Sequence, residues 1–133
     1  MILLERYLAR LEETIRSRKE IEIEELEIER KSKGVERSAE FYARLSFYDD
    51  SRLEASEKLS VERNVIVKTR YAYHYQDKDD KAIFRYDNVP HHPEVKTHPH
   101  HKHLGDKVLA TEPPDLSEVL REIDKILYEE MDG

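Results

Sequence analysis

The middle of the chain reads Phe41-Tyr-Ala-Arg-Leu-Ser-Phe-Tyr48, a run with the period of two that is typical of a β-strand. One face of this strand would carry Phe41, Ala43, Leu45 and Phe47, and the other would carry Tyr42, Arg44, Ser46 and Tyr48. Asp49-Asp-Ser51 is typical of a turn, and Leu53-Glu-Ala-Ser-Glu-Lys-Leu-Ser-Val61 then forms the returning strand. The run therefore predicts an antiparallel β-hairpin.

Further strands are predicted on both sides of this hairpin. The chain continues with Val65-Ile-Val-Lys-Thr-Arg-Tyr-Ala-Tyr-His-Tyr75, a turn at 77–80, and Lys81-Ala-Ile-Phe-Arg-Tyr-Asp87. Before the hairpin, residues 19–30 alternate until Glu24-Glu25, where the apolar residues change parity, as a strand with a β-bulge would. The alternative is a first helix that continues to about Lys33, because Glu, Lys and Leu are good helix formers. We favour the strand, and short connections then predict an antiparallel meander over residues 19–87.

A helix is expected near each end of the chain. Residues 1–17 carry apolar side chains at helical spacing. Residues 115–131 do the same, with Asp115 as N-cap and Glu118 as its capping-box partner. A short closing strand is predicted at 108–110. The predicted fold is α+β, an antiparallel sheet of four to six strands flanked by N-terminal and C-terminal helices.

Composition narrows the classes of protein to which the chain can belong. Its 133 residues are expected to form a single domain, 1–133. The absence of cysteine excludes disulfides and thiolate chemistry and favours a cytoplasmic location. No stretch approaches the roughly 20 apolar residues needed to cross a bilayer, and the N-terminal run is too charged for a signal peptide. The 40% of charged residues, with only three Asn or Gln, indicates a thermophilic source.

The histidines are concentrated in one segment. Six of the seven fall in the run Asn88-Val-Pro-His-His-Pro-Glu-Val-Lys-Thr-His-Pro-His-His-Lys-His-Leu104, where Pro-His-His occurs twice. Three prolines exclude a continuous helix or a central strand, so residues 88–107 are predicted to be a loop. The net charge of −7 argues against indiscriminate nucleic-acid binding, but three lysines make residues 91–107 locally cationic.

Three interpretations of the histidine segment remain open. Two histidines could act as general base and general acid, with Lys102 or Arg85 stabilising charge on phosphorus, which suits metal-free cleavage of RNA. Alternatively, the segment could hold zinc or another divalent transition metal through His98 and His100, or through His101 and His103. The third ligand would then be His91, His92 or Asp87. The third interpretation is a solvated polar loop that binds metal only adventitiously.

The strand that precedes this segment is rich in tyrosine. Tyr71, Tyr73 and Tyr75 share one face, and they either cover a half-buried sheet or form a stacking platform for bases. Arg85 and Asp87 also share a face, either as a structural ion pair or with Asp87 orienting a loop histidine.

The segment also carries a resemblance to a known family. Phe84-Arg-Tyr-Asp-Asn-Val-Pro-His-His-Pro-Glu94, followed by His98-Pro-His-His-Lys-His-Leu104, resembles the hallmark of the TumE-like proteins over roughly residues 36–105. His98 departs from the pattern, in which an aromatic residue more often precedes Pro-His-His. The resemblance implies a prokaryotic toxin that is encoded beside a small helix-turn-helix antitoxin.

The leading hypothesis is a toxin that acts on RNA as a ribonuclease without a cofactor. The predicted catalytic residues are His92, His100, His101, His103 and Asp87, and the predicted substrate-binding residues are Arg70, Tyr73, His74, Tyr75, Arg85, Asn88, His91 and Lys102. The expected partners are RNA, the antitoxin and a second copy in a homodimer, with no membrane. The alternative is a non-catalytic metal-binding or regulatory protein.

Overall fold

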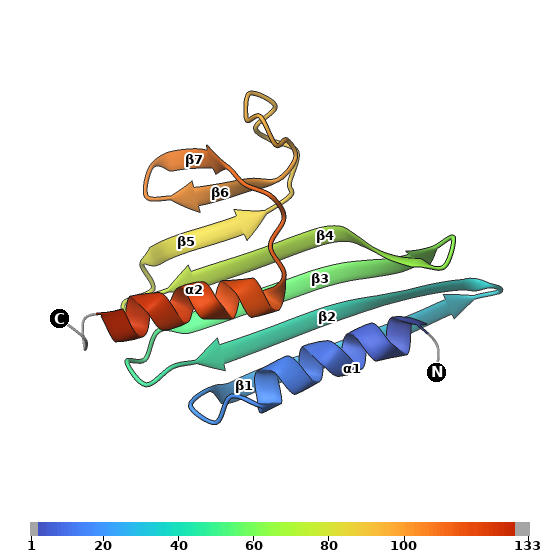
Figure 1. Ribbon diagram of the computed structural model, residues 1–133, viewed down its shortest axis with the longest axis horizontal. Helices are drawn as coiled ribbons and strands as arrows, with labels where there is room; N and C mark the ends of the chain where they lie inside the picture. The colour runs from blue at the N-terminus through green and yellow to red at the C-terminus, as the bar shows by residue number, and fades with distance from the viewer. Residues whose placement is uncertain (1–2, 130–133) are drawn as a thin grey trace.

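The computed structural model describes residues 3–129 of the chain. Its elements are α1 (Leu3–Arg16), β1 (Glu22–Lys33), β2 (Glu36–Ser46), β3 (Arg52–Glu62), β4 (Val65–Gln76), β5 (Ala82–Asp87), β6 (His101–Leu104), β7 (Lys107–Ala110) and α2 (Leu116–Tyr128) (Figure 1). The α+β class is confirmed, with seven strands where four to six were predicted. Residues 1–2 and 130–131 of the predicted helices lie outside the described part of the chain.

The strands form one antiparallel sheet in chain order, β1-β2-β3-β4-β5-β6-β7. Local sequence explains several of its details. The pairing of β1 with β2 shifts register between Ile23 and Glu25, which confirms the predicted bulge and excludes the long first helix. Arg63 and Asn64 both have positive φ and form the two-residue turn between β3 and β4, a conformation that suits a hairpin. Asp115 caps α2 and shares a capping box with Glu118, as predicted.

The predicted loop over residues 88–107 is shorter than expected. Only residues 88–100 are irregular, because residues 101–104 form β6 and pair with β5. The prolines at 90, 93 and 99 all precede His101, so they do not prevent a strand from beginning there. The closing strand predicted at 108–110 is confirmed as β7, which pairs with β6.

The two faces of the sheet differ in what lies over them. Both helices pack against one face, which we call the covered face (Figure 1). Alternate strand residues meet them there and form the core, including Phe41, Leu45, Leu53, Tyr71, Tyr73, Tyr75 and Phe84. The opposite face, the open face, has no helix over it within residues 3–129. Its side chains are mostly polar, as the period of two requires when one face is buried.

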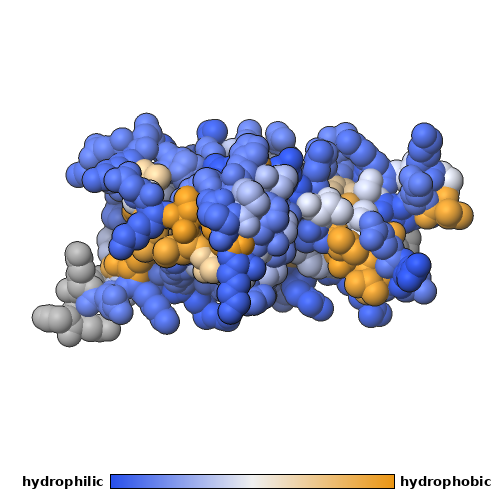
Figure 2. Space-filling view, turned by 90° about the horizontal axis from the view of Figure 1, so that it is seen from above, coloured by the Kyte–Doolittle hydropathy of each residue, from blue (hydrophilic) through white to orange (hydrophobic). Residues whose placement is uncertain are grey.

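The described surface is predominantly hydrophilic. Figure 2 shows hydrophobic side chains in separate patches among hydrophilic ones when the molecule is seen from above. Between residues 3 and 129, neither helix is long and apolar enough to cross a membrane.

Candidate functional site

Strand register brings the candidate site together on the open face. Asp87 lies opposite His101, and Arg85 lies opposite His103, in the pairing of β5 with β6. His92 reaches the same place from the loop that joins these strands, with its ring centroid 5.1 Å from that of His101. We call these five residues the histidine cluster. They line a small pocket of about 280 Å³, together with Val89 and His91.

Asp87 is the acceptor at the centre of the cluster, and only 3% of its surface is exposed. Its Oδ2 accepts a hydrogen bond from Arg85 Nε at 2.9 Å, and its Oδ1 accepts one from the Val89 N–H at 3.0 Å. Burial alone would raise the pKa of this carboxyl, but these hydrogen bonds and the nearby charges of His101 and Arg85 lower it below its usual value. Asp87 is therefore an ionised carboxylate near neutral pH.

His101 is held on both sides of its ring. Its Nδ1 lies 2.9 Å from the carbonyl oxygen of Pro99, and its Nε2 lies 3.0 Å from Asp87 Oδ1. A carbonyl and an ionised carboxylate can only accept hydrogen bonds, so the geometry matches an imidazolium with two N–H donors. Because the side chain is also buried, His101 is suited to positioning and charge stabilisation.

His103 and His92 are the accessible imidazoles of the cluster, with 34% and 31% of their side chains exposed. Partial burial is the main cause that lowers the pKa of His103; Asp87 opposes it, and the charges of His101, His92 and Arg85 act in the same direction as burial. His103 is thus neutral and able to accept a proton at neutral pH. His92 Nδ1 lies 3.1 Å from Glu94 Oε1, so this nitrogen donates and Nε2 faces the other way around the ring.

The same three histidines have the geometry of a metal site. One nitrogen from each of His92, His101 and His103 lies within 4.8 Å of the others. Metal-bound histidines usually donate their second N–H to a carboxylate or a backbone carbonyl, and Glu94 and Pro99 supply such acceptors. The donor set therefore fits a transition metal with three nitrogen ligands. It combines the predicted pair His101 and His103 with His92, one of the predicted third ligands, and it does not include His98 or His100.

Two predicted site residues lie on the other side of the sheet. His100 stacks on Tyr71 on the covered face, with its Nδ1 3.0 Å from the tyrosine hydroxyl. Lys102 donates to Glu122 of α2 at 2.6 Å. Successive residues of an extended chain point to opposite faces, which separates His100 and Lys102 from His101 and His103. His98 is exposed in the loop, where its ring lies beside the backbone carbonyl of His92.

The remaining predicted substrate-binding residues are divided between buried positions and the open face. Tyr73 and Tyr75 are 0% exposed beneath the helices, so they offer no surface on which a base could stack. Asn88 is buried as well, and it bridges the Tyr71 N–H and the Thr69 carbonyl. Arg70 and His74 lie on β4 and point to the open face, on the side of the sheet where the cluster lies.

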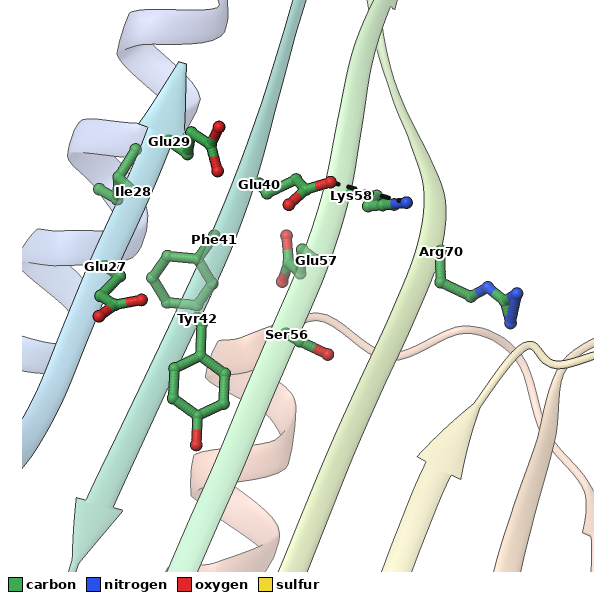
Figure 3. Close-up of a pocket in the computed structure, with 10 residues that line it drawn as sticks. All are labelled: Glu27, Ile28, Glu29, Glu40, Phe41, Tyr42, Ser56, Glu57, Lys58 and Arg70. Atoms are coloured by element: carbon green, nitrogen blue, oxygen red, sulfur yellow. Dashed lines mark ion pairs between the residues drawn. The ribbon is translucent and has the colours of Figure 1, made fainter. Parts of the chain in front are cut away.

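A larger hollow of about 650 Å³ lies on the open face over β1 to β4, and it shares no lining residue with the pocket at the cluster. Figure 3 shows its lining from β1 to β4, with Lys58 paired to Glu40 and Arg70 extending towards β5. The sequence prediction missed its members Tyr42, Ser56 and Lys58 as functional candidates. Alternation had already assigned Tyr42 to the polar face. Cross-strand register places Tyr42 in the same row as Asp87 and His101, and the sequence does not reveal this register.

Comparison with known proteins gave one match. The family described as "Toxin TumE" matches residues 10–131, which is nearly the whole chain. Neither the curated proteins nor the solved structures gave a match.

Proposed function

We propose, because the chain belongs to the TumE toxin family, that it is a toxin which cleaves RNA at the histidine cluster. A toxin of this class has an antitoxin partner, for which we propose a small helix-turn-helix protein. The observation that carries the proposal is the convergence of three imidazoles around one buried carboxylate, beside the partly exposed Arg85. General acid–base catalysis of phosphodiester cleavage needs two titrating groups and a cation within reach of one phosphate.

The geometry supports a distinct role for each side chain. His103, neutral because its pKa is lowered, would take the proton from a ribose 2′-hydroxyl. The 2′-oxygen would attack phosphorus, and His92 would protonate the departing 5′-oxygen to leave a 2′,3′-cyclic phosphate. Arg85 and the imidazolium of His101 would stabilise the charge that develops on the phosphoryl oxygens, while Asp87 holds both in place.

The test is cleavage of a fluorogenic RNA in the presence of EDTA. The wild type should cleave the RNA, leave the matching all-deoxy oligonucleotide intact and release a cyclic phosphate. His103→Ala should lower the rate at least about 100-fold, within the range for general base catalysis. Expression without antitoxin should slow growth, and the same substitution should relieve this effect. Equal cleavage by wild type and His103→Ala would remove the cluster from the mechanism.

A second candidate function is transition-metal binding at the same cluster. It is favoured by the nitrogen triad and by the acceptors that fix the second N–H of His92 and His101. A bound ion would supply a polarised water as a nucleophile. His92, His101 and His103 would hold it, and His101 would lose its proton to Asp87 or solvent on binding.

Calorimetric titration of Zn²⁺ into chelator-treated protein separates the two candidates. Stoichiometric submicromolar binding that His101→Ala abolishes, with cleavage only in the presence of metal, would favour the metal site. The pH profile gives an independent distinction. A bell-shaped rate profile in EDTA indicates two histidines, whereas a rate that requires metal and rises steadily with pH indicates a metal-bound hydroxide.

A further inference from the structure

From the arrangement of the open face we infer that a single RNA strand leaves the histidine cluster along a trough across strands β5, β4, β3 and β2, and that the hollow at its far end binds a guanine base. This inference rests on the proposed function, because it places the nucleotides that flank the cleaved phosphate. It concerns a separate set of residues, so each can fail without the other.

The trough follows one row of cross-strand neighbours. Register places Tyr42 beside Ser56, Ser56 beside Ala72, Ala72 beside Asp87, and Asp87 beside His101. Ser56 and Ala72 are the two small side chains in the middle of this row, between an aromatic ring and the cluster. A row with small residues at its centre leaves a depression in the face, and Ser56 is part of the lining of the 650 Å³ hollow.

The neighbouring rows form the sides of the trough, and each contains cations beside a carboxylate, Glu40 in one row and Glu54 in the other. On one side, Lys58 and Arg70 are paired across β3 and β4 and are exposed. On the other side, His74 lies next to Arg85. The cations Lys58, Arg70 and Arg85 beside a groove are suited to following a phosphate backbone, with bases directed to the floor. The row thus connects the hollow with the cluster along the sheet, and its nearest cations are Lys58, Arg70 and Arg85, although the whole chain has a net charge of −7.

The far end of the trough has a different chemistry. Glu27 and Glu29 of β1 line the hollow and are exposed, and Tyr42 lies opposite Glu27. Carboxylates would repel a phosphate there, but they accept hydrogen bonds from N–H groups of a base. Guanine presents two adjacent donors, N1–H and the 2-amino group, and can pair with a carboxylate through both. The Tyr42 ring supplies a surface for stacking.

Strand spacing sets the distance between this end and the cluster. Tyr42 and Asp87 are three strands apart, which corresponds to about 14 Å at about 4.8 Å for each strand. The base at Tyr42 is therefore not attached to the cleaved phosphate itself, and a short extended segment of RNA must connect the two. A dinucleotide would occupy the cluster alone, and only longer RNA would reach the hollow.

The experiment compares short and long substrates in a variant that fills the trough. Ser56→Trp should lower kcat/KM at least about 10-fold for an oligonucleotide that contains guanine, and leave cleavage of a dinucleotide unchanged. Ser60→Trp, on the same strand and face but outside the trough, is the matched control. Tyr42→Ala should cost about 10-fold on the long substrate through lost stacking. Circular dichroism would verify the fold of each variant.

Base preference is measured with oligouridine that carries one guanine at each position in turn. One position should be favoured, and inosine there, which lacks the 2-amino group, should lose most of the advantage. Glu27→Gln with Glu29→Gln should reduce the preference. Undiminished long-substrate cleavage in Ser56→Trp would overturn the trough while dinucleotide cleavage still supported the proposed function.

A binding experiment tests the trough even if the protein cleaves no RNA, a result that would overturn the proposed function. Fluorescence anisotropy then measures binding of the same guanine-containing oligonucleotide to the wild type and to Ser56→Trp. Equal binding, or no binding, overturns the trough. Loss of antitoxin binding with unchanged RNA binding also overturns it, because the trough would then be a protein-binding surface.

Discussion

Two nearly buried carboxylates lie on opposite faces of the same sheet, Glu57 under the helices and Asp87 on the open face, with 0% and 4% of their side chains exposed. Glu57 accepts hydrogen bonds from the hydroxyls of Tyr7 and Tyr73 at 2.5 and 2.6 Å. Asp87 is instead surrounded by Arg85, His101 and His103. The first carboxylate accepts from two neutral hydroxyls, with the Lys68 ammonium farther away at 4.0 Å, and the second is surrounded by groups that are charged or can titrate near neutral pH.

The difference lies in what each network connects. Tyr7 belongs to α1 and Tyr73 to β4, while Lys68 links Tyr73 to the Pro114 carbonyl just before α2. Burial and the charge of Glu57 raise the pKa values of Tyr7 and Tyr73, so both remain protonated donors. The Glu57 network thus joins α1, and the segment just before α2, to the sheet. The Asp87 network joins only β5, β6 and their loop, and it leaves two imidazoles accessible.

The largest expected effect is on stability, from Glu57→Ala. Removing this acceptor leaves two buried hydroxyls without their partner and Lys68 without its nearest carboxylate, so the free energy of unfolding should fall by about 3 kcal/mol. Urea denaturation measures the change. Glu57→Gln keeps a carbonyl acceptor and should lose less than half as much. An unchanged midpoint in Glu57→Ala would show that the network does not support the fold.

Asp87→Asn should affect RNA cleavage strongly and stability only slightly. The amide keeps the shape but removes the charge that holds His101 and Arg85, so we expect RNA cleavage to fall about 100-fold. The free energy of unfolding should change by about 1 kcal/mol, as for one lost hydrogen bond. Cleavage rates and urea denaturation of the same preparation test both parts. A stability loss as large as that of Glu57→Ala would remove the contrast between the two faces.

The pH dependence of stability should be smaller. Burial lowers the pKa values of His74, His100 and His103, so the folded protein binds fewer protons than the unfolded chain just below pH 6.5. Their contribution to stability is present above the unfolded pKa of about 6.5 and is lost as the pH falls through the lower folded values. Urea midpoints should therefore decrease between about pH 7 and pH 5.5. His103→Gln should make this decrease shallower; an identical slope would contradict the assignment.

The smallest effect is expected from His100→Phe. Phenylalanine can keep the stacking on Tyr71, and position 100 lies on the covered face, away from the cluster. Cleavage should stay within about twofold of the wild type, since substitutions that change neither a catalytic contact nor the core usually have small effects. A loss comparable to that of Asp87→Asn would mean that the loop rearranges to bring both faces together.

Much of the fold could be predicted because its signals are local. Alternation in residues 41–61, the parity change at Glu24-Glu25 and the Asp115 cap each depend on neighbouring residues, and each appears in the structure. The strand β6 was missed because prolines dominate the segment, although all of them precede His101. A local pattern can locate a strand, but it does not show where a proline-rich loop ends.

The candidate site was harder to predict because it depends on register. Sequence indicated Asp87, Arg85 and the histidines, but the pairing of β5 with β6 selects His101 and His103 and leaves His100 and Lys102 on the covered face. The tyrosines illustrate the same limit. The sequence showed that they share a face. It did not show that both helices pack over that face, because this packing depends on long-range contacts that alternation does not reveal.

The connection between β5 and β6 has a consequence for the order of folding. Every strand pairs with its chain neighbour, and the other turns in the described sheet contain two to five residues, whereas this one spans residues 88–100. Closing the longer loop costs about 1 kcal/mol more in entropy, so β1 to β5 can form rapidly from local contacts before β6 joins them. The cluster exists only after that step. A ribosome therefore synthesises most of the sheet before the chain acquires the arrangement of histidines that would make it harmful.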